Sequence, residues 1–214
     1  MSVLTHNPKP GLWRRAAMRL AATAVAVLSF ALPAAAHAQH GSWDLGMMYT
    51  QERSKFVGAD TANNYFYLRG ASIDVGYTLW KGVGVVGSGT GLVATNLLGN
   101  IDIQHIEGLG GLRYTYNWGH ITPEASSRKL GVFVEAKGGY TLGTSGLYPV
   151  NGVVQNHASG LTYAGGGGVN VHVYHRFDLR LVDAQYVITK LPNGTTNQQN
   201  TLRVSAGVNF HFGP

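Results

Sequence analysis

Two residues in the C-terminal half, His157 and Ser159, have the types and spacing of a general base beside a nucleophile. A serine hydroxyl attacks only when a histidine takes its proton, and that histidine needs an acid to orient it. No glutamate follows Glu135, and the dozen residues after Ser159 carry no acid. A hydrolytic site would need an acid from a distant part of the chain, so we expect no catalysis.

Three glycines, Gly82, Gly84 and Gly87, fit the G-x-G-x-x-G spacing of a dinucleotide-binding turn. That turn works only between a strand and a helix, because the helix N-terminus holds the pyrophosphate. Here strand-like sequence follows, and the second run, Gly165 to Gly168, lacks the Lys-Ser or Lys-Thr of a phosphate loop. Both runs are typical of closely packed strands, and we predict no cofactor.

The nine histidines could supply metal ligands, but their spacing argues against a site. His172 and His175 lie three residues apart, which in a strand places them on opposite faces. His105, His172 and His211 could all face one interior, yet nothing in the sequence brings them together. We therefore predict no metal site. The chain has no cysteine, which excludes disulfides and thiol chemistry.

Charged residues on the polar faces of alternating segments form the most informative set. They are Asp74, Glu107, Arg113, Glu135, Lys137, Arg180 and Arg203. If these segments form the wall of a closed barrel, as argued below, the charges lie inside it. They must then pair with one another, because an unpaired buried charge is costly. We predict that Glu107 and Glu135 pair with Arg113, Lys137, Arg180 or Arg203. Such a network would plug the lumen; a gated ion path is the functional alternative.

Eight strand-like segments would position these side chains. Apolar and polar residues alternate in them with a period of two, as Ile73, Val75 and Tyr77 do with Asp74 and Thr78. The segments run over 41–50, 65–80, 82–95, 102–117, 129–142, 159–174, 176–188 and 200–212. Their lengths suit tilted strands that cross a membrane.

The last segment decides which face lies inside. Its apolar face carries Leu202, Val204, Ala206, Val208, Phe210 and Phe212. In a soluble carrier of the lipocalin type this face would point inward and hold a ligand, whereas in a membrane barrel it points outward into lipid. Charged residues make up only 12% of the chain, against about 25% in soluble domains, so we predict the outward direction.

The N-terminus reads as an export signal. Arg14, Arg15 and Arg19 precede an apolar stretch from Leu20 to Leu32, and the small-residue site Ala36-His37-Ala38 follows. This pattern predicts a signal peptide over 1–38. Four of the 16 basic residues and none of the 10 acids would leave with it, so the remaining net charge is +2. That charge gives no support to nucleic-acid binding.

The connections between segments alternate in length. Tight turns are expected at Trp80-Lys81-Gly82 and at His175, and a longer link with Pro123 at 118–128. The other side has a medium loop at 96–101 and long polar loops at 51–64, 143–158 and 189–199. Short turns face the periplasm and long loops the exterior in outer-membrane barrels, so we place both chain ends in the periplasm.

The seventh segment does not alternate cleanly. Leu179 and Leu181 share a face with Asp183, while Arg180 shares its face with Val182. One extra residue in the strand would restore a polar and an apolar face. We therefore predict a β-bulge near Val182–Asp183.

The chain resembles the small eight-stranded outer-membrane barrels of the OmpA transmembrane-domain and OmpX type. The resemblance is carried by the Ala36-His37-Ala38 site, the segment Phe177 to Tyr186 and the strand Leu202 to Phe212. It departs from the pattern at its end, where Gly213-Pro214 follow the aromatic that the barrel-assembly machinery reads. The resemblance implies an outer-membrane location in a Gram-negative bacterium. It also implies that this machinery binds the C-terminal strand.

These observations predict an all-β protein: a signal peptide at 1–38 and, over 39–214, a closed antiparallel eight-stranded transmembrane β-barrel. Its role would be structural or in surface interaction, without catalysis. Expected partners are outer-membrane lipid or lipopolysaccharide, the assembly machinery, and an extracellular ligand held by the loops, but no nucleic acid. Two alternatives remain. One is a barrel enzyme similar to the lipid A deacylases, centred on His157 and Ser159; the other is the soluble periplasmic carrier.

Overall fold

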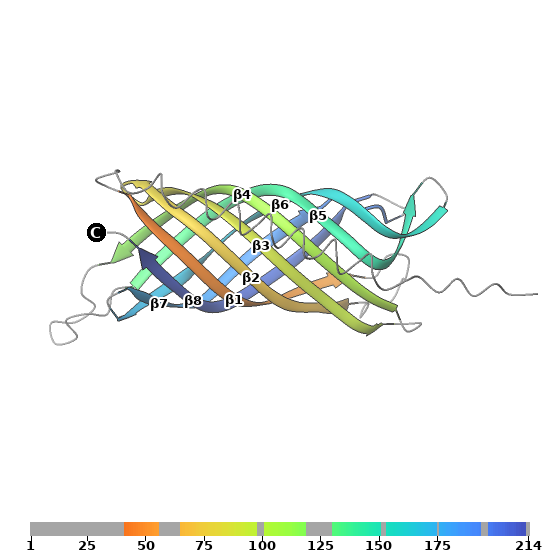
Figure 1. Cartoon of the computed structure of the whole chain (residues 1–214), viewed down its shortest axis with the longest axis horizontal. Coiled ribbons are helices and arrows are strands. Elements are labelled where there is room, and N and C mark those ends of the chain that lie inside the picture. The colour runs from red at the N-terminus through yellow and green to blue at the C-terminus, as the bar shows by residue number, and fades with distance from the viewer. Residues whose placement is uncertain are drawn as a thin grey trace, which may run out of the picture. The chain divides into compact units, whose positions relative to one another are not determined.

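The protein is a closed barrel of eight antiparallel strands, in which each strand pairs with the next and β8 returns to β1 (Figure 1). The computed structural model describes residues 41–55, 65–97, 101–118, 130–150, 153–174, 176–193 and 197–212. The strands are β1 (Ser42–Lys55), β2 (Tyr65–Trp80), β3 (Val83–Leu97), β4 (Ile101–Trp118), β5 (Leu130–Val150), β6 (Val153–Tyr174), β7 (Phe177–Thr189) and β8 (Gln199–Phe212). The predicted signal peptide lies outside the described residues.

Alternation along the strands sets the two faces of the wall. In β8, Leu202 and Val204 are 50% and 43% exposed on the outside, while Arg203 and Ser205 are buried inside. The outward direction predicted for the apolar face is therefore confirmed, and it is the reverse of what a lipocalin-type carrier requires. In the described part of the chain, no helix is long and apolar enough to cross a membrane.

Strand β7 contains the predicted bulge. Arg180 pairs with Gly207 and Asp183 with Ser205, so Leu181 and Val182 together occupy the space of one β8 residue. Both bulge side chains face outward, at 51% and 36% exposure. The extra residue shifts the phase of the strand, and Arg180, Asp183 and Gln185 consequently all face inward.

Three predicted loops are shorter than expected. β1 continues to Lys55, which takes the first five residues from the predicted loop 51–64. The predicted loop 143–158 is instead a hairpin, because β5 and β6 stay paired up to Val150 opposite Val153. The loop 189–199 loses its ends, since Thr189 pairs with Gln199. Pro149 and Asn151-Gly152 in the sequence favour a loop, but the two-stranded pairing continues through Pro149 to Val150.

The strand directions define two ends of the barrel. At one end lie the start of β1, the end of β8 and the turn Trp80-Lys81-Gly82. Lys81 and Gly82 have positive φ angles of 46° and 84°, and a Cβ on Gly82 would lie 2.1 Å from the Thr115 carbonyl oxygen. This is the expected tight turn, and the glycine run continues into β3. The β5–β6 hairpin extends at the opposite end (Figure 1).

Candidate functional site: the barrel interior

An ionic layer crosses the barrel between β2, β4, β5 and β7. Arg113 Nη2 lies 2.6 Å from both Asp74 Oδ2 and Glu135 Oε2. Arg180 Nη1 reaches the same Asp74 oxygen at 3.0 Å, and Lys137 Nζ lies 2.6 Å from Glu135 Oε1. All five residues are buried. Because each charge meets opposite charges at hydrogen-bond distance, the layer offsets the cost of desolvation.

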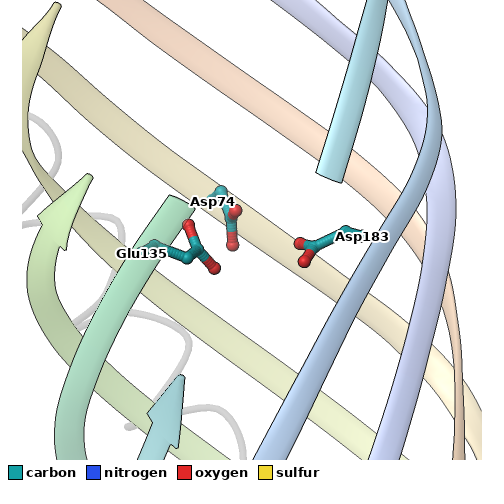
Figure 2. Close-up of side chains that lie close together, drawn as sticks. All are labelled: Asp74, Glu135 and Asp183. Atoms are coloured by element: carbon teal, nitrogen blue, oxygen red, sulfur yellow. The ribbon is translucent and has the colours of Figure 1, made fainter. Parts of the chain in front are cut away.

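Three carboxylates of this layer, Asp74, Glu135 and Asp183, point toward one another (Figure 2). They offer oxygens that all lie within 4.8 Å of one another, which is a spacing that could hold a cation. Three basic groups already surround them, since Arg180 Nη1 also lies 3.8 Å from Asp183 Oδ2. With three acids against three bases the layer is balanced, and a metal would have to displace an existing ion pair.

One aromatic ring organises the two arginines. The Phe133 ring is 1% exposed and faces inward from β5. The guanidinium carbons of Arg113 and Arg180 lie 4.9 Å and 4.5 Å from its centroid. Gly168 on β6 makes room for it, because a Cβ there would lie 2.8 Å from the ring. Phe133 thus holds both cations in place by cation–π attraction and by filling the lumen.

A second ionic layer lies nearer the hairpin end. Arg203 on β8 donates from Nη2 to Glu52 Oε2 at 2.7 Å and from Nη1 to Glu107 Oε1 at 2.5 Å. Arg203 therefore joins β1 to β4 across the interior. Thr141 donates to Glu107 at 3.1 Å and shares a hydrogen bond of 2.6 Å with Thr162. Further hydroxyl contacts link Thr50 to Ser72 and Ser205.

At the end of the barrel where β1 begins and β8 ends, acids and histidines form a hydrogen-bonded chain. His211 contacts Asp44 through Nδ1 at 2.5 Å and Asp178 through Nε2 at 2.7 Å. His172 Nδ1 lies 2.7 Å from the other Asp178 oxygen. These groups line a polar cavity of about 540 Å³ whose wall also includes Arg113 and Arg180. Of the three inward histidines, two thus share one aspartate.

The structure brings all seven predicted site residues into ion pairs inside the barrel. Sequence reasoning missed Glu52, because β1 was expected to end at Thr50. It also missed Asp183 and Gln185, because unbroken alternation puts them on the face of Leu179 and Leu181, and only the bulge turns them inward. Phe133 was overlooked although it lies two residues from Glu135 on the same face. His175 lies outside the described residues.

His157 and Ser159 lie on the outer wall of β6 and are both exposed. Ser159 pairs with Leu142 of β5, whose side chain faces the same exterior. Among the described residues, neither His157 nor Ser159 forms a side-chain hydrogen bond or ion pair. The base–nucleophile contact that a serine hydrolase needs is therefore not assembled in this structure.

The chain is similar in fold to several solved structures. Neisserial surface protein A covers 81% of this chain and 100% of its own at 14% identity, with a TM-score of 0.58. The attachment invasion locus protein Ail of Yersinia pestis shows 19% identity over the same shares, with a TM-score of 0.47. OprG of Pseudomonas aeruginosa, at 12% identity, covers 81% of this chain and 97% of its own, with a TM-score of 0.40. No curated protein matches the sequence.

The family comparison covers most of the barrel. The outer membrane protein beta-barrel domain family matches residues 22–210. This match agrees with the closed eight-stranded sheet, the apolar outer wall and the polar interior described above. The chain belongs to the outer membrane protein beta-barrel domain family and is an integral protein of the cell outer membrane.

Proposed function

We propose that the protein is a closed, non-catalytic scaffold of the outer membrane that presents the β5–β6 hairpin and its neighbouring loops for interaction at the cell surface. The observation that carries this proposal is the pair of ionic layers that cross the interior. Two ionic layers join strands across the lumen, and the Phe133 ring lies against the guanidinium groups of two arginines. An eight-stranded barrel has an interior just wide enough for its side chains, so these groups act as a plug.

The orientation follows from the two ends. The turn at Lys81 is tight and lies at the same end as the start of β1 and the end of β8, as periplasmic turns do. The opposite end carries the long hairpin, with Val153 and Val154 exposed at 62% and 59%. Exposed apolar side chains on a projecting element are typical of a binding surface. We therefore assign the hairpin end to the exterior, where an extracellular ligand would bind.

Conductance tests the plug. The protein is purified from outer membranes and reconstituted into planar bilayers, with insertion checked by its heat-modifiable gel band. We expect no single-channel steps, because both ionic layers close the lumen. Stable steps from the folded wild-type protein would overturn the plug and favour the gated ion path. In that case Arg203→Ala, which removes the cation of the second ionic layer, should alter the size of those steps.

A further inference from the structure

Three basic residues stand on the outer wall of the barrel, facing lipid. Of the seven Lys and Arg residues in the described strands, Arg113, Lys137, Arg180 and Arg203 are inside. The other three are exposed on adjacent strands near the hairpin end: Arg53, Lys55 and Arg69. A charge on the lipid face destabilises a barrel unless it lies near the membrane interface or meets a counter-charge.

No acidic side chain in the described parts of β1, β2 and β8 supplies that counter-charge. Glu52 and Asp74 are buried inside, and Asp44 is half-buried in contact with His211. Arg53 instead stacks on an aromatic ring, its guanidinium carbon 3.7 Å from the Tyr65 centroid. Stacking orients the guanidinium and leaves its N–H edges free to donate to an anion.

An apolar groove begins directly beside these cations. It has a volume of about 390 Å³ and is lined mainly by Tyr49, Tyr67, Leu202, Val204 and Ala206, with Arg53 in its wall. The strand register explains its shape, because Tyr49 pairs with Ala206 while Arg53, four residues further along β1, pairs with Leu202. The small Ala206 leaves a depression between larger side chains, and the cations lie toward its hairpin end.

We infer that this surface of β8, β1 and β2 binds a phosphate-bearing lipid of the outer leaflet, with an acyl chain in the groove and a headgroup phosphate on Arg53 and Arg69. The two arginines lie on neighbouring strands, with Arg69 opposite Gln51 and Arg53 opposite Tyr67. Guanidinium groups in such proximity match the geometry and charge of a phosphate. Flanking tyrosines favour the same depth, the membrane–water interface. The inference rests on the proposed orientation of the hairpin end, but not on the plug.

Binding of lipid A tests the site. The full protein is purified from outer membranes, stripped of lipid in mild detergent, and titrated with lipid A under native mass spectrometry. We expect the R53Q/R69Q variant to bind about tenfold more weakly, because charge-assisted contacts to phosphate are lost. The matched control K81Q/R176Q removes two exposed cations at the opposite end and should stay within about twofold of wild type.

Two further binding measurements distinguish the contribution of the headgroup phosphates from that of the acyl chain. Lipid A with its phosphates removed should bind wild type as weakly as lipid A binds R53Q/R69Q. Ala206→Trp fills the groove from the outer wall and should weaken lipid A binding while the heat-modifiable band persists. Equal loss in R53Q/R69Q and the control, unchanged binding in R53Q/R69Q, or full binding of the dephosphorylated lipid would each overturn the inference. None of these results bears on the conductance test.

Discussion

Arg203 is the residue on which the second ionic layer, nearer the hairpin end, depends. Its guanidinium contacts both Glu52 and Glu107, and all three side chains are buried. Removing the cation alone would leave two carboxylates enclosed without a positive partner. Breaking a buried pair in this way costs more than replacing the whole group with apolar residues of similar size.

Arg203→Ala is therefore expected to destabilise the folded barrel by about 3–5 kcal/mol. Urea titration in detergent micelles, read by the fraction of unboiled protein in the compact gel band, measures the change. The triple variant E52Q/E107Q/R203M removes the charges together and should recover much of the loss. If Arg203→Ala unfolds at the wild-type urea concentration, the contacts of Arg203 do not stabilise the barrel.

Ser159→Ala should leave lipid A acylation unchanged in cells that express the protein. Ser159 and His157 are exposed on the outer wall and, in the described residues, have no hydrogen bond to each other. Mass spectrometry of extracted lipid A from cells with wild type, Ser159→Ala and no protein measures the outcome. A deacylated species present only with wild type would establish the enzyme that this geometry argues against.

Residue direction could be predicted from the sequence wherever the period of two was unbroken. Asp74, Glu107, Arg113 and Glu135 all lie inside for that reason. Individual partners could not be predicted, because they depend on the stagger between strands. The contact between Arg203 and Glu52, for example, requires the β1–β8 register, which pairs these two residues.

The β7 bulge sets the composition of the first ionic layer, the one built around Asp74, Arg113 and Glu135. Arg180 precedes the bulge along β7 and Asp183 follows it, and both side chains face inward. Deleting Val182 would remove the extra residue and force one half of the strand out of phase, which turns charged side chains toward lipid. The sequence revealed this bulge because its alternation failed within one strand.

We expect the Val182 deletion to abolish folding, whereas Val182→Ala should lower stability only slightly because its side chain is on the outer wall. Yield of the compact, unboiled gel band after refolding compares the two variants. A deletion variant that refolds with wild-type yield would show that the bulge is dispensable.

The β5–β6 hairpin is longer than its sequence predicts. Glycine, proline and asparagine suggested a loop over 143–158, but backbone pairing with the neighbouring strand continues through Pro149. Thr144 and His157 are paired partners near the base of the projecting part. A two-residue Asn-Gly turn joins such a pair well.

Replacing residues 145–156 with Asn-Gly should shorten the hairpin without unfolding the barrel, since the ionic layers lie on other rows of the sheet. We expect the compact gel band to persist and binding of the extracellular ligand proposed above to fall to background. Loss of the band would mean that the hairpin contributes to barrel stability, and unchanged binding would move recognition to the remaining loops.

For the molecule as a whole, closure of the sheet predicts a resistant fold. Each of the eight strands has two hydrogen-bonded neighbours. The closed sheet therefore has no edge strand with unpaired backbone groups at which detergent could begin to unfold it. The protein run on a gel in dodecyl sulfate without boiling should migrate as a compact band and shift only after boiling. A single band regardless of boiling would contradict the membrane barrel.

The first and last strands meet at one seam, and the interior contacts across it have a consequence for biogenesis. Within the described strands, Arg203 of β8 is the cationic partner of both Glu52 and Glu107. Neither acid can form this ion pair until β8 has been synthesised. Asp44 likewise contacts His211 near the C-terminus. In a polypeptide truncated before β8, Glu52 and Glu107 would lack Arg203 as their partner. A barrel closed without β8 would therefore enclose unneutralised negative charge, which destabilises it. The ion pairs of Arg203 thus stabilise a barrel that contains β8 and not one that lacks it.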